Sequence, residues 1–122
     1  MDTLISKPEM KSVIDLTQES VHTNDNKDIG DIEAMNQDFI VVKRGFWDTY
    51  YYYIPISKVK GWDGHVVWLN ISETEVINSY ERDEQPDRLT YYTKEIGYSS
   101  TDVTSTMTEG LPSIPVISPK DK

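Results

Sequence analysis

The histidines and carboxylates are the side chains of this sequence that could carry out acid–base or metal chemistry. His22 and His65 each fall in a predicted strand, and neither has a second histidine at a spacing suited to one metal ion. The segment 25–31 resembles a calcium loop but lacks the ligand spacing of an EF-hand. The sequence also has no cysteine, no phosphate-binding glycine loop and no nucleophile elbow. We therefore expect no enzyme: no catalytic residue, no metal site and no cofactor.

Aromatic side chains are the second group with functional potential. Residues 48–57 read DTYYYYIPIS, four consecutive tyrosines before Ile-Pro-Ile. The rings could fill and flank a small core, form an exposed patch that binds a protein, or stack on bases or sugars. Tyr and Trp dominate the energetics of protein interfaces. Stacking on nucleic acid requires a cationic track, and only Lys43, Arg44, Lys58 and Lys60 lie near the run.

The charge distribution also argues against nucleic acid. The chain carries 12 basic and 21 acidic residues, a net charge of -9. Residues 1–38 hold 9 acidic and 3 basic residues, residues 39–80 hold 4 of each, and residues 81–122 hold 8 and 5. An acidic chain without a basic stripe repels phosphate backbones and anionic membranes. We expect neither as a partner, and the acidic terminal segments favour basic proteins.

Short strands separated by turns must position these rings. Apolar residues at 13–16 and at Val21 precede an Asn-Asp-Asn turn and a new strand from Ile29. The β-branched run at 39–45, the tyrosine run and the segment after Gly61–Gly64 (GWDG) predict three more strands. Ser72 and Glu75 form an S-x-x-E capping box, which predicts a short helix.

Side-chain alternation sorts the rings into two faces. Along a strand successive side chains point to opposite sides, so Tyr50, Tyr52 and Ile54 are predicted inside, while Tyr51 and Tyr53 point outward or are covered by the helix or the tail. The next strand sorts in the same way, with Val67 and Leu69 inside and Trp68 outward. Phe46, Trp47 and Trp62 lie in connections, where rings cap the ends of the barrel or meet a partner. The candidate partner-binding residues are therefore Tyr51, Tyr53, Trp68, Trp47 and Trp62.

These elements predict one small all-β domain. Five or six strands between Val13 and Ile71 indicate a six-stranded antiparallel β-barrel with a short C-terminal helix, since a lone sheet would leave an apolar face wet. Residues 13–80 form this barrel, residues 1–12 a flexible tail, and residues 81–122 an acidic Ser/Thr/Pro-containing tail that we expect to be largely disordered. There is no apolar run of about 20 residues and no signal sequence, which predicts a cytoplasmic protein without a membrane span.

The order of motifs resembles the PRC-barrel superfamily, over roughly residues 13–80. The resemblance is carried by an IG-x-I strand start, a D-F-x-V strand, a YIP-x-S strand, a V-x-LN strand and the S-x-x-E helix start. The matching positions are Ile29, Gly30, Ile32, Asp38, Phe39, Val41, Gly45, Tyr53, Ile54, Pro55, Ser57, Val59, Val67, Leu69, Asn70, Ser72 and Glu75. The first turn, NDNKD, lacks the usual glycine. Closest are the stand-alone prokaryotic and archaeal members of unassigned function.

The resemblance implies a closed barrel used as a docking module, without shared catalytic residues. Relatives occur in the photosynthetic reaction centre, in a ribosome-maturation factor and beside the cell-division machinery. The leading hypothesis is thus a non-catalytic adaptor that docks a protein partner through outward aromatic rings or an exposed strand edge, with a homodimer also compatible. The alternative is a ribosome-maturation or RNA-processing accessory factor.

Overall fold

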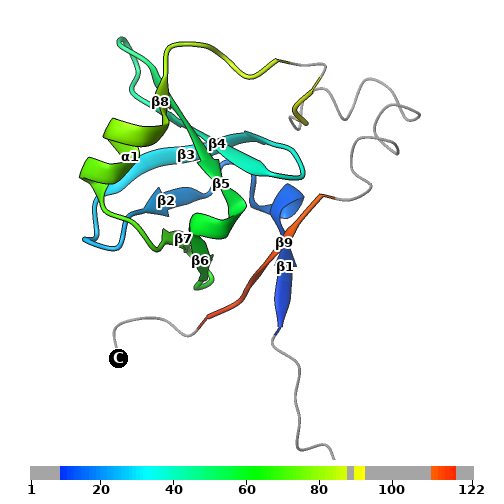
Figure 1. Ribbon diagram of the computed structural model, residues 1–122. Coiled ribbons are helices and arrows are strands. Elements are labelled where there is room, and N and C mark those ends of the chain that lie inside the picture. Colours follow the sequence, from blue (N-terminus) through cyan, green and yellow to red (C-terminus); the bar gives the residue numbers. More distant parts are fainter. Residues whose placement is uncertain (1–8, 88–89, 93–110, 118–122) are drawn as a thin grey trace, which may run out of the picture.

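The chain folds into a mostly β structure with one α-helix. A computed structural model describes residues 9–87, 90–92 and 111–117 (Figure 1). The strands are β1 (Met10–Ser12), β2 (Ser20–His22), β3 (Asp28–Met35), β4 (Phe39–Arg44), β5 (Tyr50–Pro55), β6 (Val59–Trp62), β7 (Val66–Leu69), β8 (Glu81–Arg82) and β9 (Ser113–Pro115). The helix α1 spans Glu73–Tyr80, and 3-10 turns span Val13–Leu16 and Ile56–Lys58.

The prediction of a closed six-stranded antiparallel barrel is wrong. Seven strands form an open mixed sheet in the order β6-β7-β2-β3-β4-β5-β8, and β1 and β9 form a separate two-stranded sheet. The 3-10 turn Ile56–Lys58 separates β6 from β5, and β7 pairs in parallel with β2 at the other side of the sheet. The helix α1 then returns the chain to β5, where β8 pairs. The sheet ends β6 and β8 therefore stay unpaired with each other.

Several predicted elements are confirmed. Strands β4, β5 and β7 cover the three runs read from the sequence, and α1 begins at its predicted cap, where the Ser72 hydroxyl accepts a hydrogen bond from the Glu75 amide at 3.2 Å. The apolar residues at 13–16 form a 3-10 turn in place of a strand. They still bury Val13 and Leu16, so the local conformation differs while the contribution to the core remains.

Apolar side chains cover both faces of the central strands. The larger cluster contains Ile32, Val42, Tyr52, Ile54 and other aliphatic residues of the sheet, together with residues of the 3-10 turn and of α1. A smaller cluster lies on the opposite face and consists of Ala34, Val41 and Tyr51, with Tyr53 and Tyr91 packed against it. This second cluster changes the expected placement of the tyrosines.

Parts of both segments expected as tails join the fold. Strand β1 comes from the first segment, and β8 and β9 come from the last. Tyr92 bridges Met35, with its amide donating to the Met35 carbonyl at 2.7 Å. The rest of the predicted disordered tail, residues 88–89, 93–110 and 118–122, lies outside the described residues. In the described part of the chain, no helix has the length and apolar character needed to cross a bilayer.

Candidate functional site

The connection between β4 and β5 carries the most exposed aromatic rings of the described chain. We call residues 45–49 the aromatic tip. Phe46 is 86% exposed and Trp47 is 89% exposed, and their rings contact each other edge to face with centroids 5.5 Å apart. Gly45 has φ +101°, and a Cβ there would lie 2.1 Å from the Asp48 carbonyl oxygen, so this turn requires glycine. The turn leaves both rings in solvent.

The aromatic tip stands on a rigid base. Strands β4 and β5 pair over their full length, from Phe39–Pro55 to Arg44–Tyr50. Arg44, the last residue before the tip, places its guanidinium 2.9 Å from the Glu73 carboxylate at the start of α1 and 3.4 Å from the Tyr52 hydroxyl. These contacts fix the hairpin to the helix. The tip therefore has less conformational freedom to lose when it binds a partner.

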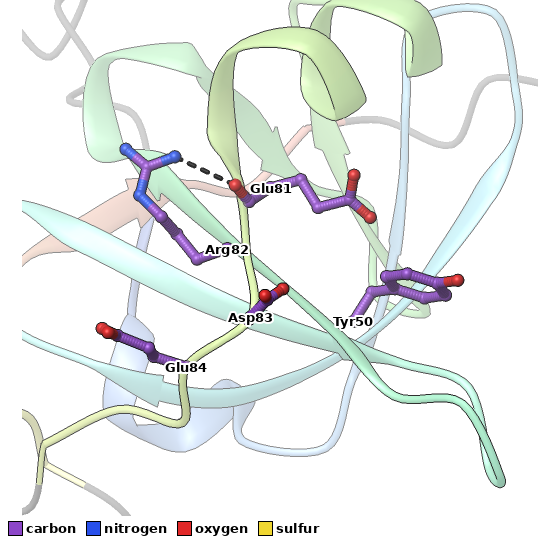
Figure 2. A pocket seen from close by; sticks show the side chains of 5 residues that line it. All are labelled: Tyr50, Glu81, Arg82, Asp83 and Glu84. Atoms are coloured by element: carbon purple, nitrogen blue, oxygen red, sulfur yellow. Dashed lines mark hydrogen bonds between the residues drawn. The ribbon is translucent and has the colours of Figure 1, made fainter.

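An acidic groove lies directly beside the tip. It has a volume of about 470 Å³ and is lined by Tyr50, Glu81, Arg82, Asp83 and Glu84, which place three carboxylates against one guanidinium (Figure 2). The Tyr50 ring, 45% exposed, and the Glu81 carboxylate lie on the same side of the groove, whereas the Arg82 guanidinium donates to the Glu81 backbone carbonyl at 3.0 Å. Because Tyr50 directly follows the tip, the two surfaces are continuous.

Tyr51 and Tyr53 do not form the outer patch that the alternation predicts. Of the two placements expected for Tyr51, outward or covered, the structure shows the covered one, because the second cluster leaves it 7% exposed. Tyr53 is partly buried, donates from its hydroxyl to the Glu84 carbonyl at 2.8 Å, and packs edge to face on Tyr91. Burial, reinforced by neighbouring Tyr91 and Glu84, raises the pKa of Tyr53 to about 12. The alternation holds from Tyr51 to Ile54, and residues after Glu81 cover the second face. The inward placement of Tyr50 is wrong, because this ring lies at the start of β5 and is 45% exposed.

Trp68 is partly buried and holds the turn before β7. Its indole nitrogen donates to Asp63 at 2.8 Å, and its ring meets His22 edge to face at 5.2 Å. The other Asp63 oxygen accepts from the His65 and Val66 amides. Partial burial opposes ionisation of this carboxyl, but the hydrogen bonds lower the pKa of Asp63 overall. The indole of Trp68 therefore stabilises the turn before β7 and packs against His22 of β2.

Trp62 lies under a distant part of the chain. The Lys11 ammonium stands 5.3 Å from its ring centroid, and the Trp62 carbonyl accepts from the Ile117 amide at 2.8 Å. Its indole nitrogen is buried and has no hydrogen-bond partner among the described residues. Trp62 is therefore not part of the surface that carries Trp47.

Of the five predicted partner-binding residues, only Trp47 lies on the surface formed by the aromatic tip and the acidic groove. Sequence reasoning did not include Phe46 and Tyr50 among the candidates. The available signal for Phe46 was its position in the short connection of a hairpin, because the tip of such a loop extends past the sheet and away from its core. Tyr50 is the first residue of β5, directly after this connection. Within residues 9–87, 90–92 and 111–117, the acidic groove included, no group of three or more His, Cys, Asp or Glu side chains could hold a metal ion.

Comparison with known proteins identifies no relative. No family model, no curated protein and no solved structure matches the chain. The PRC-barrel resemblance thus remains a sequence-level prediction, and the closed barrel that it implied is contradicted by the open sheet.

Proposed function

We propose that this protein is a non-catalytic protein-interaction module that docks a basic segment of a partner protein on its aromatic tip and acidic groove. The observation that carries the proposal is the exposure of Phe46 and Trp47 at the end of a fully paired hairpin. The role is that of an adaptor, as the sequence indicates, but the docking surface contains only one of the candidate residues named from the sequence.

Exposed rings on a rigid hairpin can supply much of a binding energy. A buried Phe or Trp ring removes about 150–250 Å² from water, and apolar burial contributes about 25 cal/mol per Å². The paired strands and the contact between Arg44 and Glu73 hold the tip in place before binding. A preorganised aromatic pair of this kind has the character of an interface hot spot.

The charge of the groove specifies the partner. Three carboxylates against one guanidinium, in a chain of net charge -9, attract lysine and arginine side chains and speed their approach. The same field repels a phosphate backbone, so a basic protein fits this surface better than RNA does. The alternative role in ribosome maturation or RNA processing predicts binding to nucleic acid and serves as a contrary outcome of the test.

The test uses a display library of natural protein segments selected on the full chain. We expect enrichment of segments that combine lysine or arginine with an apolar residue. A double variant, Phe46→Ala with Trp47→Ala, is expected to weaken the selected segment at least 100-fold, because the hot spot is lost. Met10→Ala is the matched control, since Met10 is also an exposed apolar residue but lies in β1, far from the tip (Figure 1).

The control variant should bind as the unaltered chain does. Equal binding by the double variant and the unaltered chain would contradict the proposed docking surface. Selection of acidic segments, or a preference for RNA over every segment, would contradict the proposed partner.

A further inference from the structure

A segment near the C-terminus completes the edge of the large sheet at β6. We call residues 111–117 the β9 segment. It pairs antiparallel with β1, from Met10–Pro115 to Ser12–Ser113. Beyond β9, Val116 forms a parallel bridge with Trp62, the last residue of β6, and the Ile117 amide donates to the Trp62 carbonyl. The segment thus touches the large sheet at the end of β6 through one parallel bridge, while its strand β9 lies beside β1 in the separate two-stranded sheet (Figure 1).

The edge is shaped for a close backbone approach. A Cβ on Gly61 would stand 2.7 Å from the Pro115 carbonyl oxygen and 2.8 Å from the Ile117 side chain, so only glycine admits the segment at this distance. Ile114 enters the main core and is 2% exposed. A segment that binds this edge therefore needs an extended backbone, side chains without charge, and a β-branched residue directly before a proline.

Few buried contacts hold the β9 segment. Ile114 is the only fully buried side chain of residues 111–117. Regions with so little buried apolar contact open more readily than the core.

We propose that the β6 edge is a strand-addition site that the β9 segment occupies from within the same chain. A partner segment with the Ser-Ile-Pro-Val-Ile chemistry of residues 113–117 displaces it and forms the same backbone hydrogen bonds. Attachment of the β9 segment gives it a high effective concentration at the edge, which excludes weak competitors. This site goes beyond the proposed function and uses no residue of the aromatic tip or acidic groove.

The test places a specific protease site between residues 100 and 101 of the full chain and cuts it after folding. The probe is a fluorescent peptide, Leu-Pro-Ser-Ile-Pro-Val-Ile, followed by anisotropy. We expect it to bind the cut chain at least 10-fold more tightly than the uncut chain. Gly61→Ala in the cut chain, and a peptide with aspartate in place of its isoleucine before proline, are both expected to abolish binding.

Three results would overturn the strand-addition site. They are loss of the folded circular dichroism spectrum on cutting, equal binding to cut and uncut chains, and equal binding to the Gly61→Ala chain. The double variant Phe46→Ala, Trp47→Ala should bind this peptide normally. Failure at the β6 edge and failure at the aromatic tip are therefore distinguishable.

Discussion

Two tryptophans in similar local sequences differ in their exposure to solvent in this molecule. Trp47 stands in Gly-Phe-Trp-Asp, in the connection after β4, and Trp62 stands in Gly-Trp-Asp as the last residue of β6. Trp47 is 89% exposed, whereas Trp62 is covered by Lys11 and bonded through its backbone to Ile117. Exposure here is decided by whether a segment remote in the sequence lies over the ring. One end of the fold is covered by its own chain, and the other leaves its aromatic rings in solvent.

The largest contrast should appear in stability. Trp62→Ala removes a partly buried ring together with the packing of Lys11, and we expect it to lower the free energy of unfolding by about 2 kcal/mol. Trp47→Ala should change it by less than about 0.5 kcal/mol, because an exposed side chain loses little contact. Urea unfolding followed by circular dichroism measures both. Equal destabilisation by the two variants would contradict the claim that Trp62 contributes more to stability than Trp47.

The acidic groove should contribute less than the rings. Replacing Glu81, Asp83 and Glu84 by their amides changes the net charge from -9 to -6, and we expect about 10-fold weaker binding of a selected basic segment with a shallower salt dependence. The control replaces Asp15, Glu33 and Glu75, which lie outside the groove lining, and has the same net charge. If the groove variant and the control variant lose affinity to the same extent, the loss is caused by the net charge of the chain and not by the carboxylates of the groove.

Tyr53 tests whether residues after Glu81 close the second face of the sheet. Its pKa is about 12 in the folded chain, against 10.0 for an ordinary tyrosine. The folded state holds this proton more tightly, so the stabilisation is complete below pH 10 and is lost as the pH rises towards 12. Tyr53→Phe should flatten the fall in unfolding free energy over that window. An unchanged pH dependence would contradict the burial of this hydroxyl.

The smallest effect concerns the base of the aromatic tip. Glu73→Gln removes the charge that pairs with Arg44, and partly exposed pairs contribute about 0.2–1 kcal/mol. We expect a loss of stability within that range and at most a threefold loss of affinity for the selected segment. A loss as large as that of the Phe46→Ala, Trp47→Ala double variant would mean that the ion pair, and not the rings, organises the surface.

Local elements could be predicted from the sequence because local chemistry determines them. The alternation of Tyr51 to Ile54, the turn after Trp62 and the cap at Ser72 all have causes within a few residues. They are the parts that the structure confirms.

Long-range pairing could not be predicted in this way. The parallel pairing of β2 with β7 joins residues more than 40 positions apart, and the β9 segment reaches β6 from farther still. From the local patterns alone, a closed barrel is the simplest arrangement that covers the apolar face of the predicted strands. The exposure of the candidate site residues depends on the same long-range contacts, because Tyr51 is covered by a distant segment while Trp47 is not.

The most direct test observes the three tryptophan indole N–H signals by NMR in the unaltered ¹⁵N-labelled chain. Each signal is assigned by a single Trp→Phe variant, and a selected basic segment is then added. The account predicts that the Trp47 signal shifts strongly while those of Trp62 and Trp68 stay in place. A bound segment that moves the Trp62 or Trp68 signal and leaves Trp47 unchanged would contradict it.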